Sequence, residues 1–431
     1  MITKKIIEKI EGEAEVFFEE HNNTVEFATI SFGHMRGFST ILQNKPALDA
    51  LVFTPRICGI CGHSHLYATA RALEDAYKNA GYKVELSEKA IKTREITLML
   101  EIIQNHIKWL YLTVIPKIDT LKKQDSHTKL KSLYSNTLIS KIIALLAGQY
   151  PHNSYMLPGG ITSDFTYIDI TKAIGFLDEL TIFLEKEFFG ISLEQFLTFE
   201  SCKDFNQLQS DLGDFESDLV SLNMQTKGFG FDRFLVLAEH NFTQTAKIKK
   251  TVLQKADHKY LSTSPAYSPH QNTYAYNALY KDEFIEVGPL ARTMANNIPI
   301  IKNIHRRYKD SAYARSIARI YEIPFLIQKI KTTLLEIDVT EPSFIEVPNI
   351  KKITAQGTGI VEAPRGSLIH SVSIEKGIIQ NYEIITPTQF NLASGTREKP
   401  SIAQNAMKGL TKEEATFIFR IFDVCSVCTT H

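Results

Sequence analysis

Four of the five cysteines form two C-x-x-C pairs, which stand at opposite ends of this 431-residue chain. The first pair, Cys58 and Cys61, lies in P-R-I-C-G-I-C-G-H-S-H, and the second, Cys425 and Cys428, lies in F-D-V-C-S-V-C-T-T-H at the C-terminus. Four thiolates form a soft ligand set that suits zinc, an iron-sulfur cluster or nickel. A fold that uses all four together must bring the two ends of the chain to one point.

The pairs alone leave a structural zinc open as the alternative to a reactive metal centre. Zinc ribbons usually gather their ligands within a short segment, whereas about 360 residues separate these two pairs. Polar and titratable residues also flank the cysteines, and a closed structural zinc does not need them. They are Arg56, His63, His65, Asp423 and His431. These two features favour a reactive site.

The charge balance excludes some classes of partner. Lysine plus arginine equals aspartate plus glutamate at 48 each, so no basic surplus favours nucleic acid or an anionic membrane surface. No apolar run reaches the roughly 18 residues of a membrane span, and the first residues do not resemble a secretory signal. We therefore expect no transmembrane segment and a cytoplasmic location, unless a partner carries an export signal for both chains.

Apolar periodicity predicts a predominantly helical α+β fold in one domain, residues 1–431. Alternation over residues 12–33 predicts a hairpin. Helical spacing from Leu66 onward predicts a helix that starts just after the first C-x-x-C and stops near Gly81, and a second helix is expected over residues 170–190. The clearest helix is expected over residues 87–116, with Ser87 as N-cap and Pro116 as its stop. Strands and turns are expected over residues 342–387, and the capping box that starts at Thr411 opens a last helix.

The two cysteine strings resemble the signature motifs of nickel-iron hydrogenase large subunits, R-I-C-G-I-C-x-x-x-H and D-x-C-x-x-C-x-x-H. The resemblance covers nearly the whole chain. Further matching strings are E-G at 11–12, R-G-F at 36–38, P-G-G at 158–160, E-V-G-P-L-A-R at 286–292, E-A-P-R-G at 362–366 and P-T-x-F-N at 387–391. The resemblance implies a central bundle of long helices with small peripheral β-sheets, whose terminal segments meet at the metal site. It also implies the heterolytic cleavage and formation of H2.

The resemblance assigns a place to each cysteine of the two pairs. It implies that Cys58 and Cys425 are terminal nickel ligands, while Cys61 and Cys428 bridge nickel to an iron that carries cyanide and carbon monoxide. Electron-rich sulfur suits a nickel that must change its oxidation state. His65 matches a histidine that hydrogen-bonds a bridging sulfur, a contact expected to adjust the basicity of the thiolate.

Further residues of the centre follow from the same resemblance. Pro364, Arg365 and Thr388 match residues around the diatomic ligands of iron, where a guanidinium and a hydroxyl can donate hydrogen bonds to cyanide. Arg365 would also polarise H2, and Asp423 matches the acid that pairs with that arginine.

The resemblance also implies a proton path. The proton of H2 would pass first to Cys425 and then to Glu11, which matches a glutamate that relays protons to solvent. A partly buried carboxyl with a raised pKa suits that task.

Some positions depart from the family pattern. His431 resembles a ligand of a buried magnesium or similar ion, with the carbonyl of Ile384 as a second ligand, but Ser39 stands where the family has a glutamate. A neutral hydroxyl holds a hard dication poorly, so the sequence argues against a strong magnesium site. Lys117 stands where many members carry an aspartate above the metals.

The chain needs a partner for electron transfer. One remaining thiol, Cys202, cannot hold an iron-sulfur cluster and is expected to be a packed side chain, so we expect an iron-sulfur small subunit and, further, oligomers of that heterodimer. A maturation protease is expected if a tail once followed His431. The alternative function is an H2 sensor with slow turnover. A non-enzymatic relative, such as a quinone-site subunit, would lack the cysteine pairs.

Overall fold

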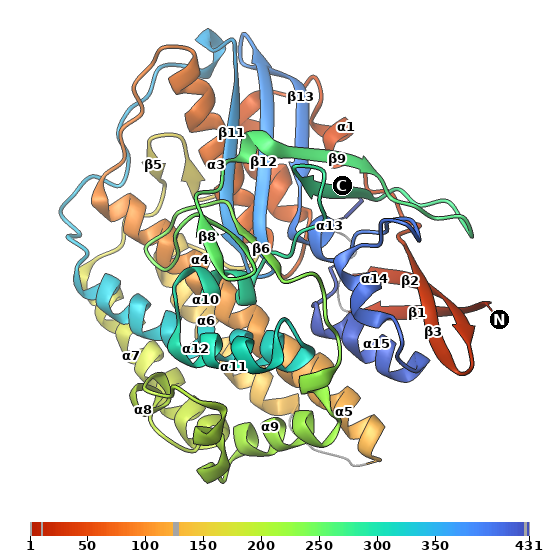
Figure 1. The fold of residues 1–431 in the computed structure, drawn as a ribbon. Coiled ribbons are helices and arrows are strands. Elements are labelled where there is room, and N and C mark those ends of the chain that lie inside the picture. Colours follow the sequence, from red (N-terminus) through yellow and green to blue (C-terminus); the bar gives the residue numbers. More distant parts are fainter. Residues whose placement is uncertain (1, 10–11, 124–128, 426–428, 431) are drawn as a thin grey trace.

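Long helices and several small sheets make up the protein (Figure 1). The computed structural model describes residues 2–9, 12–123, 129–425 and 429–430. Four long helices pack on one another in the helical part: α4 (Glu88–Trp109), α6 (Lys129–Ala147), α7 (Tyr167–Leu184) and α12 (Ala312–Leu335). The expected α+β fold, predominantly helical with small sheets, is therefore confirmed.

Among the described residues, the two larger of three three-stranded antiparallel sheets lie beside the helices. One consists of β1 (Ile2–Lys9), β2 (Gly12–His21) and β3 (Thr24–Ser31), and the other of β11 (Ala355–Ala363), β12 (Gly366–Glu375) and β13 (Ile378–Ile385). Helix α3 (Gly62–Asn79) packs along β11 and β12 (Figure 1). This contact positions the first cysteine pair, since α3 begins directly after Cys61.

The remaining elements are shorter. The helices are α1 (Phe38–Leu42), α2 (Ala50–Phe53), α5 (Ile115–Lys122), α8 (Leu193–Leu197), α9 (Asp211–Ser221), α10 (Pro289–Ala295), α11 (Pro299–Tyr308), α13 (Pro387–Asn391), α14 (Ile402–Met407) and α15 (Lys412–Ile421). The strands are β4 (Met156–Leu157), β5 (Gly160–Ile161), β6 (Arg233–Val236), β7 (Ala246–Lys249), β8 (Val252–Gln254), β9 (Leu261–Pro265) and β10 (Tyr276–Tyr280). Within the described residues, no helix combines the length and hydrophobicity that a membrane span requires.

Helix caps predicted from the sequence are present. The Ser87 hydroxyl accepts a hydrogen bond from the Ala90 amide at the start of α4, and Thr411 and Glu414 form the expected capping box of α15. Helix α3 begins at Gly62, directly after the first cysteine pair, so the predicted start of this helix and the place of Cys61 at a loop-to-helix junction are confirmed.

The prediction that Pro116 stops the long helix is wrong. Helix α4 passes into a π-helical turn, Leu110–Val114, and α5 then runs from Ile115 to Lys122. Pro116 lies in the first turn of α5. The π-helical turn lies just before Pro116, and a change of hydrogen-bond spacing of this kind lets a helix continue past a proline.

The N-terminal and C-terminal parts of the chain lie side by side. The Val25 amide donates to the Leu410 carbonyl at 2.8 Å, and the Gly409 amide donates to the Val25 carbonyl at 2.7 Å. Nearer the cysteines, the Arg36 amide donates to the Thr430 carbonyl at 2.8 Å. These contacts accompany the return of Cys425 to the first cysteine pair.

Candidate metal centre

Three of the four paired cysteines converge in the interior. The sulfur atoms of Cys58 and Cys425 lie 3.5 Å apart, and those of Cys58, Cys61 and Cys425 all lie within 4.8 Å of one another. All three side chains are buried. Three thiols this close together can bind one metal ion, whereas thiols in separate pockets could not. Cys428 lies outside the described residues.

A glycine allows the first cysteine loop to turn tightly into α3. A Cβ atom on Gly62 would lie only 2.2 Å from the Pro55 carbonyl oxygen, so this position excludes any larger residue. The close approach folds the chain back around Cys58 and leaves Cys61 at the N-cap of α3. The close contact with Pro55 thus explains why glycine follows the second cysteine of the motif.

Arg365 reaches the thiol cluster from the tip of a hairpin. Strands β11 and β12 pair up to Ala363 and Gly366, which leaves Pro364 and Arg365 as the two-residue turn. Burial disfavours the charge of Arg365, but Asp423 and the three thiol groups raise its pKa well above its usual value. The side chain is therefore a permanent cation against the thiols.

Asp423 holds this guanidinium. Its Oδ2 atom forms an ion pair with Arg365 Nε at 3.0 Å, and its backbone carbonyl accepts the hydrogen bond that Nε donates, at 2.8 Å. Asp423 follows α15 in a left-handed conformation with φ of 62°, which aspartate tolerates better than most residues. The same Oδ2 atom also accepts from Arg319 Nη1 at 3.0 Å.

Comparison with known families decides what the cluster belongs to. The family described as nickel-dependent hydrogenase matches residues 36–115 and 124–431. The chain belongs to this family. It is therefore a hydrogenase, an oxidoreductase that acts on H2. The recognition made from the two cysteine strings is confirmed, and the structural zinc is set aside.

Relatives of this hydrogenase match over nearly their whole length. The NAD-reducing hydrogenase HoxS subunit beta of Cupriavidus necator is 24% identical over 99% of this chain and 93% of the relative. The periplasmic [NiFeSe] hydrogenase large subunit of Desulfomicrobium baculatum is 23% identical over 89% of this chain and 84% of the relative. The Ni-Fe-Se hydrogenase from D. vulgaris Hildenborough has the same fold, with a TM-score of 0.84, 21% identity and full coverage of both chains.

The residues of this hydrogenase suit the metal centre of its family. The three clustered thiols supply a soft ligand set for nickel. The Thr388 hydroxyl is buried and has no hydrogen-bond partner within the described residues, so it is available to an acceptor that is not part of the chain. Pro364 stands next to Arg365 at the hairpin tip.

His65 lies on the first turn of α3 in a buried polar chain. Its Nδ1 atom is 2.9 Å from His370 Nε2, and the other nitrogen of His370 lies 2.8 Å from the Tyr382 hydroxyl. His370 pairs with Ile384 across β12 and β13. The helix that carries Cys61 is thus tied to the sheet that carries Ile384. Glu11 and His431 lie outside the described residues.

Sequence reasoning missed Asn105. This α4 residue accepts from Arg365 Nη1 at 3.3 Å and donates to the Ile60 carbonyl at 2.6 Å, so it joins the hairpin tip to the first cysteine loop. Burial lowers the pKa of Lys117, and Lys5 and Arg420 lower it further. Asn105 is a helical residue that binds the Arg365 guanidinium directly.

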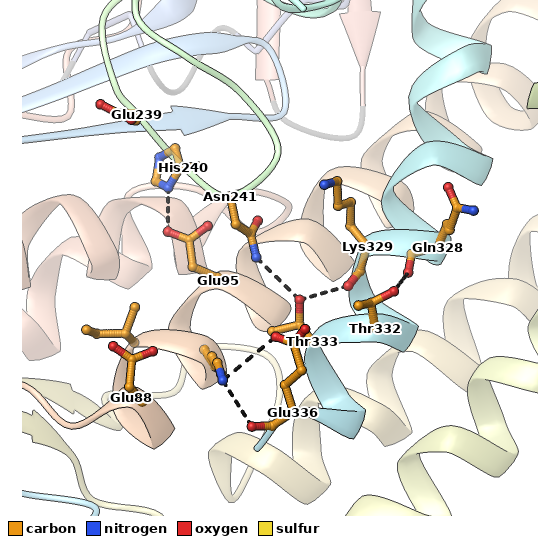
Figure 2. Close-up of a pocket in the computed structure, with 12 residues that line it drawn as sticks. Glu88, Glu95, Glu239, His240, Asn241, Gln328, Lys329, Thr332, Thr333 and Glu336 are labelled. Atoms are coloured by element: carbon orange, nitrogen blue, oxygen red, sulfur yellow. Dashed lines mark hydrogen bonds and ion pairs between the residues drawn. The ribbon is translucent and has the colours of Figure 1, made fainter. Parts of the chain in front are cut away.

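A surface cleft of about 660 Å³ lies between α4, residues 239–241 and α12. None of the predicted site residues is among the residues that line it. Figure 2 shows Glu95 and His240 joined there by a hydrogen bond of 2.7 Å. The open cleft is therefore separate from the residues that the sequence predicted for the metal centre.

Proposed function

We propose that this chain is the catalytic large subunit of a nickel-iron hydrogenase, which splits and forms H2 at a metal centre held by Cys58, Cys61, Cys425 and Cys428. The observation that carries the proposal is the convergence of three buried thiols from the two ends of the chain. When bound, the nickel-iron centre supplies the electron transfer and the cleavage of the H–H bond.

The protein's own residues have distinct tasks in this proposal. The thiolate of Cys425 accepts the proton that leaves H2, and Glu11 passes it toward solvent. Arg365 is a fixed cation over the thiols, and Asp423 keeps the guanidinium in one orientation through Nε. Because Cys425, Arg365 and Asp423 are buried, they act where water does not screen them.

We further propose that iron with cyanide and carbon monoxide ligands occupies the site next to nickel. The buried hydroxyl of Thr388, without a partner in the described part of the chain, and the Arg365 guanidinium are donors that suit cyanide nitrogen. His65 is proposed to hydrogen-bond a bridging sulfur while His370 orients its ring.

The magnesium site is proposed to be weak. His431 and the Ile384 carbonyl would be its ligands, and Ser39 offers a hydroxyl instead of a charged group. We expect magnesium to be lost on dialysis while nickel is retained.

A partner subunit is part of the proposal. The relatives are named as subunits of larger hydrogenases. We propose an iron-sulfur small subunit as the electron acceptor, because Cys202 lies outside the thiol cluster and a single thiol cannot hold a cluster. Location in the cytoplasm stays a prediction, since one relative is named as periplasmic.

Metal analysis of the purified complex tests the function. We expect about one nickel and one large-subunit iron per chain, together with infrared bands of cyanide and carbon monoxide. Zinc in place of nickel would contradict the proposal. Turnover with an artificial electron acceptor separates the enzyme from the H2-sensing alternative, for which we expect slow turnover and a signalling partner in pull-down experiments.

A further inference from the structure

A chain of buried polar contacts runs from Arg365 into the helical part of the protein. Asp423 Oδ2 binds both Arg365 Nε and Arg319 Nη1 at 3.0 Å. Arg319 Nη1 also lies 3.5 Å from His106 Nδ1, and His106 Nε2 lies 2.8 Å from Glu322 Oε2. This series of contacts thus leads from the metal centre to side chains that touch neither the thiols nor Arg365.

The contacts of His106 define its tautomer. Arg319 Nη1 can only donate, so His106 Nδ1 must accept and Nε2 must carry the proton that it donates to Glu322. The imidazole is fully buried, and burial lowers its pKa to about 4. His106 is therefore a neutral connector with one donor and one acceptor, each used by a charged neighbour.

Glu322 is anchored on its far side. Its two oxygens accept hydrogen bonds from Arg292 Nε and Nη2, both at 2.7 Å. Arg292 further donates to the Ala363 carbonyl at 2.9 Å, on the strand that leads to the hairpin tip. A carboxylate held by a two-pronged guanidinium cannot rotate, so it fixes the ring of His106.

Helix α4 holds the Arg319 guanidinium from two sides. The Trp109 ring lies beneath it at 4.9 Å, and His106, one turn earlier, faces Nη1. Arg319 shares its acceptor, Asp423 Oδ2, with Arg365. A shift of Arg319 therefore moves the oxygen that forms the ion pair with the arginine at the thiols.

We propose that His106 is a positioning residue of the hydrogenase centre, which orients Arg365 through Arg319 and Asp423. The acceptor atom Nδ1 carries this effect, whereas the donor Nε2 only anchors the ring. The inference rests on the proposed function, because its effect is measured on the infrared bands of the cyanide to which Arg365 would donate.

Two substitutions of His106 separate its two nitrogens. In His106→Asn, the side-chain oxygen can take the place of Nδ1 and still accept from Arg319, while the donor to Glu322 is lost. In His106→Gln, the amide nitrogen can take the place of Nε2, while the acceptor for Arg319 is lost. The infrared bands of cyanide are measured in each loaded complex, together with kcat and KM for H2.

We expect His106→Gln to shift the cyanide bands and to lower kcat roughly tenfold, with KM changed less than about twofold, because one hydrogen bond to a charged group is lost. His106→Asn should give a clearly smaller shift. Unchanged bands in His106→Gln, or a shift in His106→Asn that is as large, would overturn the inference. Absence of cyanide bands from the unsubstituted complex would instead refute the proposed function.

A matched control comes from His305 on α11. This buried histidine also binds a carboxylate through Nε2, at 2.6 Å from Asp232 Oδ1, but Asp232 is not among the residues that connect His106 to Arg365. His305→Gln should lower the unfolding temperature and leave the cyanide bands in place. If His106→Gln fails to load metals, Arg319→Lys serves as the second variant, and it must shift the same bands or the inference is wrong.

Discussion

At the residue scale, Arg365 combines three properties that a reactive cation needs. It is buried, it is held through Nε by two oxygens of Asp423, and its Nη1 atom is directed to Asn105. A lysine in its place would keep the charge but could not make these planar contacts.

Arg365→Lys should therefore lower H2 oxidation about 100-fold, the loss typical of removing one fixed donor from a reacting centre. Nickel content should stay unchanged, because the substitution touches no thiol. The rate is measured with H2 and an artificial acceptor, beside nickel determined on the same sample. A rate within about threefold of the unsubstituted protein would contradict a role for this guanidinium.

Glu101 makes stability depend on pH near neutrality. Burial raises its pKa to about 7, although its hydrogen bonds with the Ser64 side chain and the amides of His63 and Ser64 lower it. An unfolded glutamate loses its proton near 4.3. The folded protein therefore keeps the proton longer, and the stability gained from this is complete below about 4.3 and lost as pH rises through about 7.

Glu101→Gln cannot ionise, so it should flatten the fall in unfolding temperature between pH 5 and pH 8, a change on the order of 2–3 kcal/mol. Calorimetric unfolding of the loaded protein across this range measures it. The exposed Glu88 on the same helix provides the control, since Glu88→Gln should leave the slope as it was. Equal slopes for both variants would rule out Glu101 as the titrating group.

The sequence predicted the thiols and Arg365 because short motifs contain them. It did not predict Asn105, His106 or Arg319, because these residues lie on helices without a motif and meet the centre only in three dimensions. A buried charged residue in a helix cannot be told from an exposed one by its type, since most such residues are exposed.

At the scale of elements, α3 lies unusually close to β11. A Cβ atom on Gly359 would stand 2.0 Å from the Ala68 carbonyl oxygen and 2.4 Å from the Ala72 amide nitrogen, so helix and strand touch through their backbones. Helix α3 cannot move away without shifting Cys61 at its N-cap.

Gly359→Ala should destabilise the protein by about 1–3 kcal/mol, the usual range for overpacking, and should reduce the nickel retained. Thermal unfolding and nickel analysis check both effects. Gly175→Ala on α7 is the control, because its added methyl group meets nothing within 4 Å and should leave both quantities nearly unchanged or raise stability slightly. Full nickel occupancy in Gly359→Ala would contradict the link between this contact and Cys61.

Elements were predicted best where the pattern is long. The periodicity of α4 and the capping signals of α4 and α15 were sufficient to predict these helices. The alternation of apolar residues was sufficient to predict the hairpin of β2 and β3. The strand β1 was missed because its sequence, I-T-K-K-I-I-E-K, does not alternate. The sheet of β6, β7 and β8 and the two-stranded sheets were missed because their strands are too short for a periodicity to be seen. The π-helical turn before α5 has no sequence signal that distinguishes it from the helix around it.

At the scale of the whole molecule, one metal site joins two segments whose thiols are 367 residues apart in sequence. A metal that binds only the folded protein, at a thousand times its Kd, stabilises it by about 4 kcal/mol. Protein produced without nickel should therefore unfold at a lower temperature and lose its C-terminal segment first to a protease.

Unfolding curves and timed proteolysis of nickel-loaded and nickel-depleted protein measure this difference. Cys202→Ser should behave like the unsubstituted protein in both states, because Cys202 lies outside the cluster. Identical unfolding temperatures with and without bound nickel would mean that the metal does not join the two segments.

The distance along the chain between Cys58 and Cys425 has a consequence for biosynthesis. Ribosomes add about 5–20 residues per second, so roughly 20–70 s pass between the synthesis of the first thiol pair and that of Cys425. During this interval the nascent chain offers two reactive sulfurs to any copper, zinc or oxidant in the cell. Accurate assembly therefore depends on timing as well as on affinity.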